Sequence, residues 1–266
     1  MIMLHSFRKP LADLPVANAS NTTYGWSSEN WSGYALTSDT QGTYTSISGT
    51  WVVPEVSVPA SPNPNSEDNF WTWIADIFDG DGLTQSSSSY SATWIGIDGF
   101  TNSQLIQTGT AQNIVDGQAQ YFAWWEILPN PETQLSTSQY PVSPGDEMQA
   151  QIAQQADGTW SIILTDMTQN WTFTENGIEY TGPQTSAEWI EEAPALNGAI
   201  TTLANYGSIS FESTQTNNQN PEFTLYDAGV MIQNGQWIST PSQPNANGNG
   251  FIIGYGSSIP PAPTTN

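Results

Sequence analysis

Three segments of this chain place polar side chains directly among bulky aromatic residues. Residues 91–109 include Gln107, residues 121–129 include Glu126, and residues 186–194 carry three glutamates. Carboxyl groups in such surroundings can act as general acids or bases, and carboxamides can donate and accept hydrogen bonds. The alternative is that these residues are merely solvated, as most charged side chains are. The segments are therefore candidates for carboxyl and amide chemistry.

The remaining composition removes most other catalytic chemistries. The lone histidine, His5, and both basic residues, Arg8 and Lys9, lie within the first nine positions, and the chain has no cysteine. Histidine-based triads, lysine Schiff bases and typical zinc sites are thus excluded from the rest of the chain. Nucleic-acid binding is not expected because it depends on Arg and Lys, and no apolar run of about 18 residues predicts a membrane span.

The charge balance predicts a protein suited to acid. Twenty-five acidic residues face two basic ones, which gives a net charge of −23. Mutual repulsion raises the pKa of folded-state carboxyl groups, so their contribution to stability is present at low pH and is lost as the pH rises. We therefore expect an acid-adapted, secreted protein, with adaptation to high salt as the alternative.

The elements that must position these residues are strands. Residues 44–53 place Ile47 and Trp51 on one face, and residues 159–166 place Trp160 on a face with other apolar side chains. No convincing helix of 12 or more residues is predicted. The pattern is typical of an all-β protein, and we expect a single domain built as an antiparallel β-sandwich of two packed sheets.

Hairpin turns divide the predicted strands. Asp157-Gly158, Asn176-Gly177 and Asn234-Gly235 each separate strand-like runs. Residues 147–181 accordingly predict a four-stranded antiparallel meander.

Composition also divides the chain. Residues 1–22 are expected to form a flexible leader or propeptide remnant, residues 23–256 the sandwich, and residues 257–266 a proline-rich tail. A second proline-rich stretch, roughly 54–68, should be a surface loop.

Strand periodicity separates the glutamates of the third segment. In a strand, Glu188, Ile190 and Glu192 face one way, whereas Trp189 and Glu191 face the other. Glu191 and Glu192 therefore cannot both serve one site. A short helix that begins near the first of these glutamates is the alternative.

The order of several short motifs resembles that of the eqolisin-type glutamic peptidases. That family consists of acid-active endopeptidases with a sandwich of two antiparallel sheets, so the resemblance implies polypeptide substrates and no cofactor or metal. It covers roughly residues 28–255 and rests on these pieces: Asn30-Trp31-Ser32-Gly33, Trp94 to Gly99, Ile106 to Gly109, Tyr121 to Pro129, Ala187 to Glu192 and Leu203 to Gly207.

By this resemblance the catalytic pair is Gln107 and Glu192. One departure is Phe122, which stands where fungal members carry an acidic residue, and it affects the expected subsite preference. The positions that match residues lining the family's substrate groove are Trp31, Trp94, Asp98, Trp124 and Glu126.

Peptide hydrolysis is chemically consistent with this pair. Ionised Glu192 can take a proton from a water molecule and return it to the departing amine. The Gln107 amide can hold that water and donate to the developing oxyanion, and its charge does not change with pH.

Two other functions fit parts of the pattern. A β-sandwich glycoside hydrolase could use Glu126 with Glu188 or Glu192 as its two carboxyl groups, and would not need Gln107. A non-catalytic lectin-like domain would use the aromatic side chains to bind sugars.

Asp76, Asp79 and Asp81 suggest a Ca²⁺ loop, but their spacing does not match the EF-hand pattern, so no metal is expected.

Arg8 and Lys9 have two interpretations. They belong either to a leftover leader or to a propeptide that places cations against an acidic groove at neutral pH and leaves on acidification. Otherwise we expect a monomer.

Overall fold

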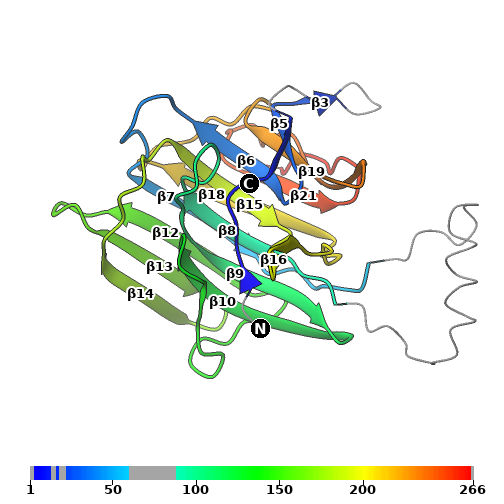
Figure 1. Cartoon of the computed structure of the whole chain (residues 1–266), viewed down its shortest axis with the longest axis horizontal. Coiled ribbons are helices and arrows are strands. Elements are labelled where there is room, and N and C mark those ends of the chain that lie inside the picture. The colour runs from blue at the N-terminus through cyan, green and yellow to red at the C-terminus, as the bar shows by residue number, and fades with distance from the viewer. Residues whose placement is uncertain (1–2, 13–15, 18–21, 60–87, 265–266) are drawn as a thin grey trace, which may run out of the picture.

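The computed structural model describes residues 3–12, 16–17, 22–59 and 88–264, and this part of the chain contains strands but no helix (Figure 1). Accordingly, no helix in it is long and apolar enough to span a membrane. Asp76, Asp79 and Asp81 lie outside the described residues, as does most of the loop at 54–68.

Most strands belong to one hydrogen-bonded path that folds into two layers. The first layer is called the front sheet. In spatial order it consists of β11 (Thr133–Gln134), β10 (Gln118–Ile127), β9 (Ile106–Val115), β8 (Ala92–Ile97), β15 (Ser186–Glu192), β6 (Trp31–Thr37) and β19 (Ala228–Gln233), with β5 (Trp26–Ser28) and β2 (Pro10–Ala12) beside β19.

The second layer, the back sheet, continues from β19 through a hairpin. Its order is β20 (Gln236–Pro241), β21 (Phe251–Tyr255), β18 (Ser208–Thr216), β7 (Ser46–Val52), β12 (Glu147–Gln154), β13 (Trp160–Asp166) and β14 (Trp171–Ile178). Two small sheets accompany these layers. One consists of β1 (Met3–Leu4), β16 (Ala195–Leu196) and β17 (Ala199–Ile200), and the other of β3 (Val16–Ala17) and β4 (Thr23–Tyr24).

The predicted all-β antiparallel sandwich is confirmed, and one strand pair, β5 with β19, is parallel. The main core lies between the two sheets. The Trp51 indole of β7 donates a hydrogen bond of 3.0 Å to Thr110 of β9, and the Trp189 indole of β15 donates one of 2.9 Å to the Ser48 carbonyl of β7. Trp51 and Ile47 are buried on one face as predicted, and so is Trp160. These inward residues hold the front sheet in place against the back sheet.

The predicted four-stranded meander at 147–181 is wrong, because three strands form there. Asp157-Gly158 and Asn234-Gly235 do connect strands, but Asn176-Gly177 lies inside β14. Ile178 faces Trp160 whereas Glu175 faces Ile162, so β14 carries one extra residue. Gly177 has a φ of 68°, a conformation that suits a β-bulge as well as a turn. The dipeptide therefore bends a strand instead of ending it.

Residues 3–12, called the leader segment from here on, cross the outer face of the front sheet (Figure 1). At one end Met3 pairs with Leu196 of β16, and at the other end β2 pairs with β5. Between them the Arg8 backbone N–H donates a hydrogen bond of 3.1 Å to the Gly99 carbonyl. The described part of the expected leader is thus attached along the sheet.

Candidate active site

Strand alternation brings the predicted site residues to the outer face of the front sheet. Gln107 of β9 lies opposite Glu126 of β10, and Glu192 of β15 lies opposite Trp31 of β6. A row of paired residues runs across the strands between these two positions. In this row Trp94 of β8 lies between Gly109 of β9 and Ile190 of β15, and Gly109 in turn lies opposite Trp124 of β10. All the predicted site residues are at most 1% exposed: Trp31, Trp94, Asp98, Gln107, Trp124, Glu126 and Glu192.

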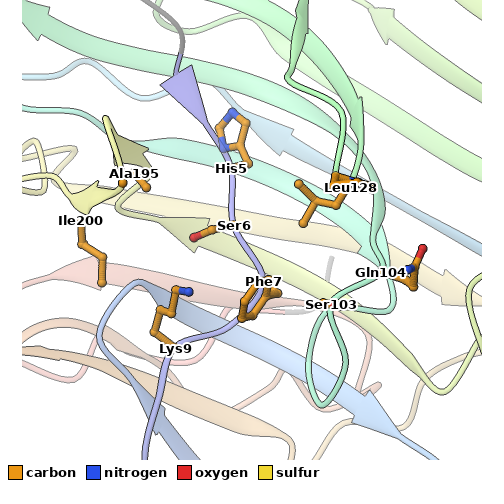
Figure 2. Close-up of a pocket in the computed structure, with 11 residues that line it drawn as sticks. His5, Ser6, Phe7, Lys9, Ser103, Gln104, Leu128, Ala195 and Ile200 are labelled. Carbon is orange, nitrogen blue, oxygen red and sulfur yellow. The ribbon is translucent and has the colours of Figure 1, made fainter.

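A cavity of about 350 Å³ adjoins this face beside the leader segment (Figure 2). His5 and Phe7 line it from the leader, and Gln104, Leu128 and Ile200 line it from the rest of the protein. The outer face is therefore partly covered and partly open.

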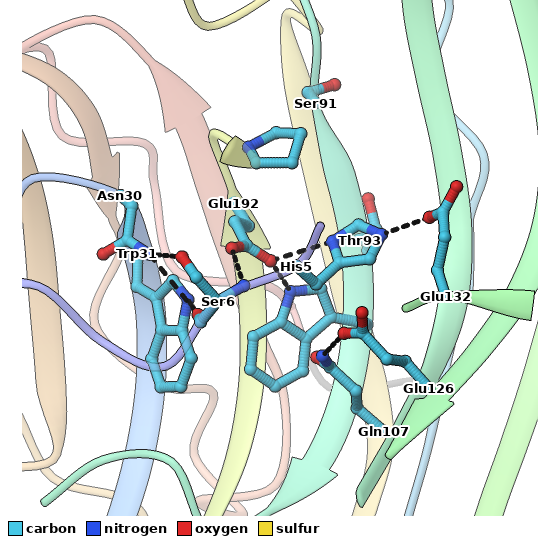
Figure 3. Close-up of polar contacts among 12 residues, drawn as sticks. His5, Ser6, Asn30, Trp31, Ser91, Thr93, Gln107, Glu126, Glu132 and Glu192 are labelled. Atoms are coloured by element: carbon cyan, nitrogen blue, oxygen red, sulfur yellow. Dashed lines mark hydrogen bonds and ion pairs between the residues drawn. The ribbon is translucent and has the colours of Figure 1, made fainter. Parts of the chain in front are cut away.

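The first polar centre of the site is the Glu192 carboxylate (Figure 3). The Trp94 indole donates a hydrogen bond of 2.9 Å to its Oε2, and the backbone N–H of Ser6 donates one of 3.0 Å to its Oε1. His5 Nδ1 lies 3.0 Å from the same Oε2. Both oxygens of Glu192 are thus engaged, and two of the three partners come from the leader segment.

The second polar centre pairs Gln107 with Glu126. Gln107 Nε2 donates a hydrogen bond of 2.7 Å to Glu126 Oε2. Burial raises the pKa of Glu126 to about 8, against the opposing effect of the His5 charge. Among the described residues, Gln107 Oε1, Glu126 Oε1 and Trp124 Nε1 have no hydrogen-bond partner. These three buried polar atoms can bond to a water molecule or a substrate, since leaving them unpaired is costly.

Gln107 and Glu192 lie on the same face but do not hydrogen-bond to each other, because every bond of Glu192 goes elsewhere and Gln107 Oε1 has none. The two side chains therefore present separate polar groups on one face of the sheet.

Glu191 lies on the opposite, inner face, as the alternation predicts. It accepts a hydrogen bond of 2.7 Å from Thr93 between the two sheets, and burial raises its pKa to about 8.

Glu188 is on the outer face with Glu192, yet neither of its carboxyl oxygens has a hydrogen-bond partner in the described chain. Burial raises the pKa of Glu188 well above its usual range. The strand prediction for 186–192 is confirmed, and the short helix is excluded.

Asp98 serves the structure around the site. It has a φ of 73° at the end of β8, and it accepts hydrogen bonds of 2.7 Å from the Tyr180 hydroxyl, 2.8 Å from the Gln184 N–H and 2.9 Å from the Thr185 N–H. Both oxygens are therefore used inside the protein, so a direct groove contact by Asp98 stays a prediction.

The predicted tryptophans form the walls of the site. Trp31 and Trp94 meet edge to face at 4.8 Å, and Trp124 stacks on the His5 ring at 3.5 Å with an angle of 10°. Trp31 Nε1 donates a hydrogen bond of 3.0 Å to the Ser6 carbonyl. Each of the three thus contacts either Glu192 or the leader segment.

Gly109, in the Gln-Thr-Gly motif, permits this packing. A Cβ built there would lie 2.1 Å from the Thr93 carbonyl oxygen and 2.6 Å from the Trp94 Cβ. Only glycine lets β9 approach β8 closely enough to hold Trp94 beside Glu192.

Two site residues were not predicted from the sequence. The sequence identifies His5 only as a cation of the leader, and no motif points to Glu132. His5 carried one usable signal, since it is the only imidazole in a strongly acidic chain. Glu132 carried none, because it lies in a short connection between β10 and β11. Among the described residues no group of three or more His, Cys, Asp or Glu side chains is arranged to hold a metal ion.

The fold is an antiparallel sandwich whose front sheet carries buried carboxyl and amide groups on its outer face. A comparison with protein families identifies it further: the Peptidase A4 family matches residues 29–253, so the chain belongs to this family. It is a glutamic endopeptidase, and the glycosidase and lectin alternatives are not supported.

Known relatives agree with this assignment. The chain is 28% identical to Aspergillopepsin-2 of Aspergillus niger over 226 residues, which is 84% of this chain and 76% of that protein. The structure of scytalido-glutamic peptidase with a transition state analog inhibitor has a TM-score of 0.64 at 22% identity, covering 85% of this chain and 98% of that chain. SCP-B, an Eqolisin family member in complex with the tripeptide Ala-Ile-His, has a TM-score of 0.59 at 21% identity, with the same coverage. At such identities the structural likeness establishes the fold.

Proposed function

We propose that the protein is an acid-active endopeptidase in which Glu192 activates a water molecule and Gln107 stabilises the oxyanion. The observation that carries this proposal is their placement on one buried face on either side of the Trp94 row, with Gln107 Oε1 unpaired. The chain offers no histidine at this face outside the leader segment, so the carboxylate is the base that remains.

The leader segment supports a peptide as the ligand of this face. The Ser6 N–H donates to Glu192, and the Ser6 carbonyl accepts from Trp31 Nε1. These are backbone groups, so any peptide could make the same two hydrogen bonds once the leader is displaced. Trp31 is therefore a residue that fixes the substrate backbone relative to the carboxylate.

Hydrolysis then follows from the positions of these groups. Glu192 takes a proton from the bound water as the water oxygen attacks the peptide carbonyl carbon. Gln107 Nε2 donates to the oxygen that becomes negative. The C–N bond breaks as the protonated Glu192 returns its proton to the leaving nitrogen, which restores the carboxylate.

Acid conditions suit the Gln107–Glu126 pair of this site. The raised pKa of Glu126, about 8, keeps the Gln107–Glu126 pair neutral throughout the acid range. The pair can then orient the Gln107 amide without a change of charge as the pH falls. We further propose that the protein acts as a secreted monomer with its leader as a propeptide, as its net charge of −23 suits an acidic medium outside the cell.

Digestion of denatured protein at pH 2–5, with and without pepstatin, tests the function. We expect cleavage that pepstatin does not inhibit and that falls about 10²–10³-fold in Gln107→Ala, the usual cost of one oxyanion donor. Circular dichroism would show that the variant is folded. Wild-type turnover by folded Gln107→Ala would contradict the proposed role of the amide.

A further inference from the structure

His5 is held on three sides at the outer face (Figure 3). Its Nδ1 lies 3.0 Å from Glu192 Oε2, its Nε2 lies 3.0 Å from Glu132 Oε2, and its ring stacks on Trp124 at 3.5 Å. The side chain is 1% exposed. The two carboxylates, one at each ring nitrogen, and the indole on the ring face together form a complete binding site for the His5 side chain.

The chemistry of this site selects a planar cation with two opposed donors. Burial lowers the pKa of His5, but the hydrogen bonds and charges of Glu132 and Glu192 outweigh that effect and raise the pKa to about 10. In the imidazolium form both ring nitrogens donate, which matches one carboxylate on each side. A lysine ammonium has no planar face to stack on Trp124.

We propose that Trp124, Glu132 and Glu192 form a subsite for the imidazolium of a histidine side chain, and that His5 occupies it so that the leader segment blocks Glu192. This inference rests on the proposed role of Glu192 as the catalytic base. It assigns Glu132 a recognition role and makes the chain's own N-terminal segment the ligand.

Blockage follows from the contacts of Glu192. Its Oε2 is contacted by His5 and Trp94 and its Oε1 by Ser6, so the leader segment occupies the positions from which a peptide would approach both oxygens. The segment is anchored further along, where the Lys9 N–H donates a hydrogen bond of 2.7 Å to Asn30. The cavity beside His5 and Phe7 shows that the segment covers the carboxylate without filling the whole face.

The cation that reaches the carboxylate is thus His5. The Arg8 guanidinium donates hydrogen bonds of 3.2 Å to the Phe100 carbonyl and 3.3 Å to the Ser27 carbonyl, and lies 4.0 Å over the Phe100 ring. The Lys9 ammonium lies 4.0 Å over the ring of Phe7. Lys9 therefore offers a control for a leader cation that does not touch the catalytic groups.

Occupancy of the subsite depends on pH in a defined direction. The ionisable groups that face His5 are Glu192 from β15, Glu132 from the β10–β11 connection and Glu126 from β10. The ion pairs need the imidazolium together with ionised carboxylates. They are lost as the pH rises through about 10, where His5 loses its proton. Deprotonation of His5 therefore weakens the hold of the subsite on the leader segment.

Activity of full-length variants tests the block. We would measure initial rates on a histidine-free fluorogenic peptide at pH 5 and pH 3 for wild type, His5→Gln, Glu132→Gln and Lys9→Ala. Loss of a charge-assisted hydrogen bond should raise the rate of the first two variants about ten-fold at pH 5. Lys9→Ala should match wild type at both pH values. Equal rates for His5→Gln and wild type at pH 5 would overturn the proposal.

A second measurement does not depend on activity. The chain has one histidine, so NMR of the full-length protein follows His5 without assignment. Its pKa should be raised to about 10 in wild type and should fall toward its ordinary value in Glu132→Gln. A normal His5 titration in an enzyme that cleaves peptides would disprove the subsite alone. A raised pKa that falls in Glu132→Gln, in a protein that cleaves no peptide at any pH, would support the subsite and disprove the proposed function.

Discussion

Glu191 and Glu192 are neighbours in β15, yet their carboxyl groups lie in opposite surroundings. Glu191 points between the sheets, where Thr93 is its hydrogen-bond donor and burial raises its pKa to about 8. Glu192 points to the outer face, where an indole, a backbone N–H and an imidazole contact it. Both are 0% exposed, so burial alone does not distinguish them.

The difference shows that the partners around a carboxyl group decide its role. On the inner face a neutral carboxyl group hydrogen-bonded to a hydroxyl is a structural element of the core. On the outer face, two N–H donors and the His5 ring are directed at the two oxygens of Glu192. The same strand thus directs one glutamate into the core and places the next at the outer face, where we propose that it acts as the base.

The largest expected effect contrasts the two glutamates directly. Glu192→Gln should lower kcat about 10²–10⁴-fold, since it removes the general base, whereas Glu191→Gln should leave kcat within a few fold. Steady-state assays at pH 3, with circular dichroism to confirm folding, check both. Equal losses in the two variants would mean that the face of the sheet does not determine the role.

Glu191, in contrast, should affect the free energy of unfolding and its dependence on pH. The pKa of Glu191 is raised in the folded state, so its contribution to stability is present below pH about 4 and is lost as the pH rises through about 8. The free energy of unfolding should therefore fall by up to about 5 kcal/mol between pH 4 and pH 9 through this residue. Denaturant titrations at several pH values should give a flatter profile for Glu191→Gln. An unchanged slope in that variant would contradict the assignment.

Gly109→Ala should affect both faces, because its Cβ would press on Trp94 and on the Thr93 carbonyl. We expect a loss of about 1–3 kcal/mol in the free energy of unfolding, together with a lower kcat. Gly117→Ala is the control, since Gly117 has a φ of 76° and no neighbour near its added Cβ. That variant should lose stability through backbone strain and keep its kcat. Unaltered activity in Gly109→Ala would show that Trp94 need not be held so closely.

The smallest effect concerns one hydrogen bond to the substrate backbone. Trp31→Phe should raise KM by about 2–10-fold with little change in kcat, because it removes the indole donor that the Ser6 carbonyl uses. Trp51→Phe removes an indole donor on the inner side, where it bonds to Thr110, and should leave KM unchanged. A KM that responds only to the inner substitution would refute the binding role of Trp31.

Much of the fold was accessible to pattern analysis, because strands have a period of two and each residue's face follows from it. The separation of Glu191 from Glu192 and the burial of Trp51 and Trp160 are examples. The turn predicted at Asn176-Gly177 is wrong, because the same backbone conformation serves a hairpin turn and a β-bulge and the local sequence does not distinguish them. The roles of Gln107 and Glu192 came from the family resemblance and remain predictions.

The sequence by itself limited the available chemistry: with no Lys, Arg or His after Lys9 and no Cys, the groups that remain are carboxyl, amide, hydroxyl and indole groups. It also determined which side chains share a face, since that depends only on neighbours along one strand. The tertiary structure alone decided that His5 meets Glu192 across a separation of 187 residues, with Glu132 on its other side. Contacts of that kind depend on the order of strands in the sheet and on where the leader segment crosses them, and no local pattern encodes either.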